Sequence, residues 1–141
     1  MATKICAITF EAFPVEHSLL APAVGYRVNA GRPCIFYGPD LIFIHGRSAA
    51  MKDVRIYIGD GATFTRSFIR KRGERLIGHA AINVQIGWCA KAGVSRAIIT
   101  HCGSEIVSGD ERNLAVSLHA MVAERGVETR FAYDGMELVL R

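Results

Sequence analysis

Apolar and polar residues follow two different periods along the chain, and these periods predict strands first and then strands interleaved with helices. Val54 to Ile58 alternates between apolar and polar positions, as a half-buried strand does. The first β-rich run is expected to end at Pro14, and Gly31-Arg32 is expected to form a hairpin turn. The predicted strands are residues 4–13, 23–30, 33–37, 54–58, 96–100, 127–132 and 137–140.

Two later segments have the spacing of amphipathic helices. In residues 80–92, the apolar positions i, i+4, i+7 and i+8 are Ile82, Ile86, Cys89 and Ala90. In residues 109–125, the corresponding stripe consists of Leu114, Leu118, Met121 and Val122. Gly93 and Gly126 follow these segments, and glycine commonly ends a helix. Residues 59–77, which are rich in glycine and arginine, are predicted to be a loop.

This order of elements predicts a mixed α/β fold in which helices cover one face of a sheet. No linker or repeat divides the 141 residues, so we expect one domain spanning 1–141. Half of the residues are hydrophobic, yet no apolar run approaches the roughly 20 residues that cross a bilayer, and Met1 to Lys4 does not resemble a signal peptide. The four cysteines form no CxxC pair, so we expect reduced thiols and a cytoplasmic protein.

Residues capable of metal binding or proton transfer stand at the ends of the predicted elements, where a rigid scaffold can hold them for chemistry. His17, Asp40 and His101 each follow a predicted strand, and His79 opens the first predicted helix. Imidazole and carboxylate groups at fixed distances bind zinc and similar ions. The positive end of a helix disfavours a protonated His79 unless a carboxylate compensates.

Each of these residues also has an ordinary structural interpretation. His17 could be a surface histidine, Asp40 a turn residue in a Gly-Pro-Asp loop, His79 a helix cap and His101 a structural histidine after a buried strand. His45 and His119 have no neighbouring motif, and we expect no catalytic role for either.

Taken in order, the short phrases around these residues resemble the second half of a metallo-β-lactamase-fold hydrolase, nearest to its ribonuclease Z and phosphodiesterase-like branch. The phrases are Val15-Glu16-His17-Ser18, Tyr37-Gly38-Pro39-Asp40, Gly78-His79-Ala80-Ala81, Ile99-Thr100-His101-Cys102 and Tyr133-Asp134-Gly135-Met136. The resemblance runs from about Ile8 to Leu140. The signature His-x-His-x-Asp-His of the family is absent from the chain.

The resemblance implies an αββα sandwich of which this chain is the C-terminal half. It also implies that His17 serves one metal ion, His101 a second and Asp40 both, while His79 protonates the leaving group or steadies the scissile phosphate. The family usually has Gly-Asp where this chain has Gly38-Pro39-Asp40, and proline removes a backbone donor there. The metal is expected to be zinc, with manganese or iron as alternatives, and to be weakly bound because two protein ligands per ion fall short of three.

The segment around Arg70 and Arg72 is an arginine cluster with interleaved Phe64 and Phe68. It predicts a weak substrate-binding role toward phosphate, with a solvated surface as the alternative. The net charge of +4 is weak support for an anionic partner, and no nucleic-acid-binding motif is present.

The sequence leaves three hypotheses about function open. The chain is a metal-dependent hydrolase of phosphoesters or another small-molecule substrate, incomplete without a second chain. Alternatively, it is a homodimeric half-domain that acts as a binding or scaffold protein, or it is an inactive remnant. The sheet face left bare by the missing half predicts association in the first two cases.

Overall fold

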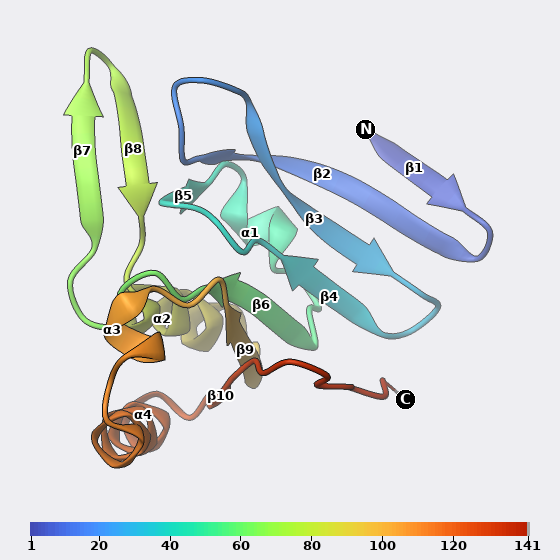
Figure 1. Cartoon of the computed structure of the whole chain (residues 1–141). Coiled ribbons are helices and arrows are strands. Elements are labelled where there is room, and N and C mark those ends of the chain that lie inside the picture. Colours follow the sequence, from blue (N-terminus) through green and yellow to red (C-terminus); the bar gives the residue numbers. More distant parts are fainter. Residues whose placement is uncertain (141) are drawn as a thin grey trace.

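A mixed eight-stranded sheet forms the centre of the computed structural model, which describes residues 1–140 (Figure 1). Its neighbouring strands are, in order, β1 (Ala2–Ile5), β2 (Ile8–Glu16), β3 (Ala23–Asn29), β4 (Cys34–Tyr37), β6 (Ile56–Asp60), β9 (Arg96–Thr100) and β10 (Glu128–Phe131). The short strand β5 (Phe43–Ile44) pairs with the end of β2. The β1–β4 portion is antiparallel, whereas β4, β6, β9 and β10 run parallel. The predicted mixed α/β fold class is therefore confirmed.

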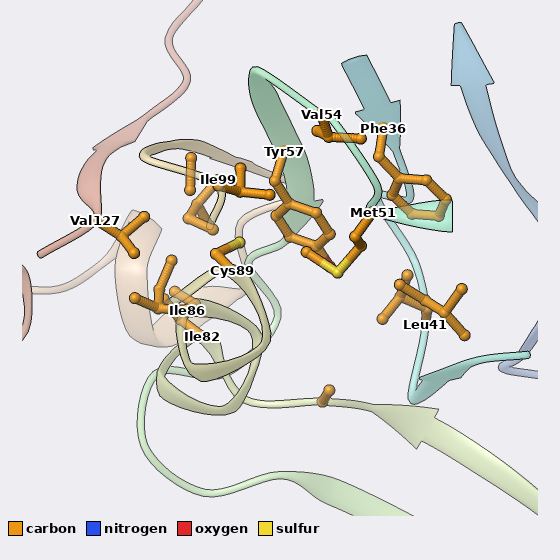
Figure 2. Packing of buried hydrophobic residues seen from close by; sticks show 14 of the residues in the cluster. Phe36, Leu41, Met51, Val54, Tyr57, Ile82, Ile86, Cys89, Ile99 and Val127 are labelled. Atoms are coloured by element: carbon orange, nitrogen blue, oxygen red, sulfur yellow. The ribbon is translucent and has the colours of Figure 1, made fainter. Parts of the chain in front are cut away.

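Within residues 1–140, four helices complete the fold: α1 (Arg47–Ala50), α2 (Ile82–Ala92), α3 (Ser104–Val107) and α4 (Glu111–Arg125). Helix α2 packs against β6 and β9, and α4 packs against α2 and β10. Figure 2 shows the resulting core, in which Tyr57, Ile86, Cys89 and Ile99 have no exposed surface. The Phe36 and Tyr57 rings stack in this core with centroids 5.9 Å apart. None of the helices within residues 1–140 is both long and apolar enough to cross a membrane.

Both predicted long helices are present, with small differences. Gly93 and Gly126 follow α2 and α4 with φ of 72° and 70°, the left-handed conformation in which glycine carries no Cβ penalty. Helix α2 begins at Ile82 rather than at residue 80, and its predicted stripe residue Ala90 is exposed. Gln85 is buried instead, because its amide has hydrogen-bond partners inside the fold.

The expectation that the first strand ends at Pro14 is wrong, because β2 continues to Glu16. Strand β1 pairs with β2 only as far as Glu11, and β5 pairs with it from Val15 onward. Pro14 therefore lies between these two neighbours at the strand edge, where its missing N–H costs no ladder bond. The segment also divides at Cys6 and Ala7 into two strands rather than one.

The loop predicted for residues 59–77 is also wrong. Strand β6 extends to Asp60, and β7 (Phe68–Arg72) and β8 (Arg75–His79) form an antiparallel hairpin that is a separate two-stranded sheet. Gly73, at φ 62°, begins the two-residue turn between them. The many arginines and glycines obscured the β-forming residues of this hairpin. In Figure 1 the hairpin extends away from the main sheet.

The chain ends differently from the prediction as well. Residues 137–140 form no strand. Val139 and Leu140 instead line a pocket together with Ile56 and Arg96, the first residues of β6 and β9. The short helices α1 and α3 were not expected, because four residues are too few to show a helical period.

The two faces of the sheet differ in their cover. In β4, the side chains of Cys34 and Phe36 point into the helix-covered core, whereas Ile35 and Tyr37 belong to the opposite face. An open apolar groove, called here the bare face, occupies that opposite side of β1–β4. Its lining residues are Met1, Thr3, Ile5, Phe10, Ala12, Tyr26, Val28, Ile35 and Tyr37.

Candidate metal centre

The carboxyl ends of the parallel strands β4, β6 and β9 meet at one edge of the sheet, and the candidate site lies there. Asp40 follows β4, Asp60 is the last residue of β6, and His101 follows β9. His79, the last residue of β8, reaches the same edge from the hairpin. One ligand atom from each of these four residues lies within 4.8 Å of the others, a grouping that could hold a metal ion.

Asp40 lies between the histidines. Its Oδ1 atom is 2.9 Å from Nδ1 of His17 and 3.1 Å from Nδ1 of His79. Its Oδ2 atom is 4.0 Å from Nε2 of His101. The two carboxylate oxygens therefore face different histidines, an arrangement in which one carboxylate serves two neighbouring positions. All four residues predicted for the site lie together, but their roles as ligands or catalyst stay predictions.

The Asp40 carboxylate fits a cation. Its Oδ1 atom is buried and has no hydrogen bond from any residue of 1–140, although two ring nitrogens are close to it. Nδ1 of His17 is also 3.0 Å from the carbonyl oxygen of Gly78, which gives that nitrogen a better-directed partner. A buried acceptor without a donor costs about 1–3 kcal/mol or more when it is charged, and a bound cation removes that cost. The donor set of carboxylate and imidazole groups suits zinc, manganese or iron.

Asp60 has the opposite character, and it was not among the residues predicted for the site. Its carboxylate has no exposed surface. Oδ1 accepts a hydrogen bond from the backbone N–H of Ala62 at 2.8 Å, and Oδ2 accepts from the N–H of Leu41 at 3.0 Å. Nδ1 of His79 lies 2.7 Å from the same Oδ2. With three donors already in place, Asp60 is suited to hold His79 rather than to bind a metal ion itself.

Gln85 secures Asp60 from the helix side, and it too was not predicted. Its Oε1 accepts from the Tyr57 hydroxyl at 2.9 Å and from the Asp60 N–H at 2.8 Å. Its Nε2 donates to the carbonyl oxygens of Asp60 at 2.7 Å and Ala80 at 2.9 Å. Burial raises the pKa of Tyr57 well above its usual range, with smaller contributions from Cys89 and Asp60, so its hydroxyl stays a donor. The amide thus uses its full hydrogen-bonding capacity to fix the backbone on both sides of the site.

The predicted position of His79 at a helix start is wrong. The residue ends β8, and α2 begins three residues later with Ala81 as its N-cap. The helix dipole therefore acts on His79 from a distance, and the neighbouring Asp60 carboxylate is the larger influence. Asp60 is thus the carboxylate that compensates for the helix dipole at His79. The pair Gly59-Asp60 at the end of a buried strand was the signal that could have revealed it.

His101 is the most open of the four grouped residues. Its backbone has φ of 52°, an unusual conformation for a residue other than glycine and one that is often found at functional sites. Its side chain is 49% exposed, and Nδ1 is 3.7 Å from Oδ1 of Asp60. The ring centroid lies 5.7 Å from that of His79. This histidine forms the solvent-facing side of the centre.

The remaining candidates lie elsewhere. Arg70 and Arg72 are exposed on β7 and are not members of the grouping. His45 pairs with Glu16 at 2.7 Å, and His119 is exposed on α4, so neither belongs to the centre.

The comparisons with known proteins are consistent with this geometry. The sequence profile of the beta-lactamase superfamily domain matches residues 1–102. Among solved structures, the chain is similar to the metallo-beta-lactamase fold protein YhfI from Bacillus subtilis, with a TM-score of 0.71 and 14% identity over 96% of this chain and 51% of YhfI. It is also similar to a diphosphatase of the PhnP family, with a TM-score of 0.62 and 13% identity over 99% of this chain and 46% of that protein. No curated protein matches the chain.

At these identities the solved structures show a shared fold. The chain spans about half the length of each of the two proteins, since it covers 51% of one and 46% of the other.

Proposed function

The chain belongs to the beta-lactamase superfamily, and on this basis we propose that it carries half of the active site of a metal-dependent phosphodiesterase. The observation that carries the proposal is the contrast between two carboxylates at one sheet edge. Asp40 has an unpaired buried oxygen among histidines, and Asp60 is fully hydrogen bonded and holds His79. The first suits metal binding and the second suits acid–base chemistry.

Asp40, His17 and His101 are the proposed metal ligands. His17 contacts one oxygen of Asp40 and His101 approaches the other, so the carboxylate could serve an ion on each side. When bound, the metal ions supply Lewis acidity and a water molecule that is easily deprotonated. We propose zinc, with manganese and iron as alternatives. Two protein ligands for each position are fewer than the three of typical catalytic zinc sites, so binding by this chain should be weak.

His79 is the proposed catalytic acid. When its Nδ1 carries the proton that Asp60 accepts, the ring has one orientation and one tautomer. Nε2 then has no partner within residues 1–140 and is available to carry a proton to the oxygen of a leaving group. The side chain is 21% exposed, which keeps it accessible to a substrate.

A second half-domain is the proposed partner. The bare face exposes Ile5, Tyr26 and Tyr37 by 59%, 40% and 43%, and large apolar patches of this kind usually mark an interface. The similar solved structures are about twice as long as the chain, so a second half of the fold would fit there. The alternative is that two copies of this chain cover each other's bare face and act as a binding or scaffold protein.

Zinc titration, metal analysis and turnover of bis(p-nitrophenyl) phosphate test these proposals. Purified protein should retain less than one zinc ion per chain, and supplying a second half-domain should raise both retention and turnover. His79→Gln should then lower turnover by about 100-fold or more while zinc retention stays unchanged. His119→Gln is the control for each measurement. Two tightly held ions in the monomer, or turnover that survives His79→Gln, would contradict the proposal.

The mass in solution distinguishes a complex with a second half-domain from a homodimer of this chain. A homodimer that remains without turnover after zinc is added would favour the scaffold alternative.

A further inference from the structure

The hairpin formed by β7 and β8 carries the entire net positive charge of the chain. Residues 66–75 contain five arginine or lysine residues and one glutamate, which gives +4, equal to the net charge of all 141 residues. The rest of the chain is therefore balanced. The five cations are Arg66, Arg70, Lys71, Arg72 and Arg75.

These cations are exposed and lack acidic partners. All five side chains are exposed, and no ion pair within residues 1–140 involves any of them. The Arg70 guanidinium lies over the ring of Phe68, whose centroid is 4.9 Å away, and this contact leaves its charge uncompensated. A surface cation without a partner remains available to an anion from outside the chain.

The hairpin is joined directly to the candidate metal centre. His79 is both the last residue of β8 and a member of the centre, and it pairs with Phe68 at the base of the hairpin. The N–H of Gly78 donates to the carbonyl oxygen of His17 at 3.0 Å, which anchors this base beside the centre. Because Phe68 pairs with His79, a molecule that follows β7 outward begins beside the centre.

The cations along β7 are regularly spaced. Phe68, Arg70 and Arg72 occupy alternate positions and so share one face of the strand. At a rise of about 3.4 Å per residue, Arg70 and Arg72 lie roughly 7 and 14 Å beyond Phe68. A single phosphate cannot reach both arginines and the centre, whereas an extended chain with repeated negative charges can.

We infer that the hairpin binds single-stranded nucleic acid and directs it toward the metal centre. The inference rests on the proposed phosphodiesterase function only in choosing a phosphodiester polymer as the polyanion. Arginine forks suit phosphate oxygens, and the exposed Phe68 ring on the same face of β7 offers a stacking surface to an unstacked base. An anionic membrane would satisfy the charge, but it would not explain the alignment of the arginines with a catalytic edge.

The test is a fluorescence anisotropy titration of the purified protein with labelled oligothymidylates of 2, 4, 8 and 12 nucleotides in EDTA. Affinity should rise with length up to the few nucleotides that span the hairpin. The double variant Arg70→Ala/Arg72→Ala should bind the longer probes about tenfold more weakly and bind the dinucleotide unchanged. Its slope of log K against log salt should be shallower by about 1.4, because each lost phosphate contact contributes about 0.7 for single strands.

The matched control is Arg32→Ala/Arg112→Ala, which removes the same charge from two exposed positions outside the hairpin. Equal weakening by both double variants, or affinity that is independent of probe length, would overturn the inference. Binding to phosphatidylserine vesicles without binding to any oligothymidylate would overturn it in favour of a membrane surface. Because EDTA prevents metal chemistry, a failure of the proposed hydrolysis does not affect this outcome.

Discussion

The two halves of the sheet differ in how their apolar side chains are covered and how their polar side chains are hydrogen bonded. In the parallel half, α2 covers β6 and β9, and Asp60 and Gln85 form hydrogen bonds with all of their available carboxylate or amide groups. In the antiparallel half, β1–β4 leave an apolar face open, and Asp40, which follows β4, keeps a buried oxygen without a donor. The covered half thus holds Asp60 in a fixed position. The open half, in contrast, has an apolar face and a carboxylate oxygen that would each be stabilised by a group from outside the described residues.

The strongest test of this contrast compares the same substitution at the two aspartates. Asp60→Asn places an amide N–H₂ among three N–H donors, so at least one buried donor loses its acceptor. We expect a loss of about 2–4 kcal/mol in the free energy of unfolding, measured with urea in EDTA. Asp40→Asn should not destabilise the fold, since no hydrogen bond to Oδ1 is lost and a buried charge without a donor is removed. Equal costs at both positions would remove the distinction between them.

His101→Ala tests metal binding at the sheet edge, where the ends of the open and covered halves meet. The loss of ligand support outside the first coordination sphere alone costs about 10–100-fold in metal affinity, so the removal of a direct ligand should cost more than about 100-fold. Isothermal titration with zinc measures the effect. His119→Ala, on the exposed surface of α4, should leave zinc affinity unchanged. Equal zinc affinity of the two variants would show that His101 is not a metal ligand.

The bare face can be tested separately from the metal centre. Tyr26→Glu and Tyr37→Glu introduce charge into the apolar groove, so both the binding of an apolar dye and self-association should fall several-fold. Val116→Glu is the matched control, because Val116 is 69% exposed on α4 and lies outside the groove. Dye fluorescence and sedimentation measure the two effects. A wild-type protein that is monomeric and binds no dye would show that this face needs no partner.

The residues of the candidate site differ in how far they can be predicted from sequence. His101 and Asp40 were predicted as candidates because each follows shortly after an apolar strand, which is a local signal. Asp60 was missed because the glycine-rich and arginine-rich segment after Ile58 was assigned to a loop. Gln85 was missed because a polar residue within a helix gives no sign that the backbone of another strand will surround it. Its partners, Tyr57 and Asp60, are set by tertiary packing rather than by a local pattern.

The hairpin of β7 and β8 could not be predicted from the local sequence pattern either. The β-forming residues Phe68, Ile69, Leu76 and Ile77 are few and are separated by charges, so the pairing of the strands was hidden. The arginine cluster was visible in the sequence, but its connection to His79 through β8 depends on strand register.

Thiol reactivity gives a final and smaller test of the same contrast. Burial in the covered half raises the pKa of Cys89 to about 12, so at pH 8 only about one thiol in ten thousand is ionised. Cys6 is exposed in the turn between β1 and β2. Because the thiolate is the nucleophile, iodoacetamide at pH 8 should modify Cys6 within minutes and leave Cys89 unmodified in the native protein, as read by peptide mass spectrometry. Cys34 and Cys102, whose pKa values burial also raises, should react more slowly than Cys6. In urea all four should react alike, and early native-state labelling of Cys89 would mean that the covered half opens far more readily than its packing implies.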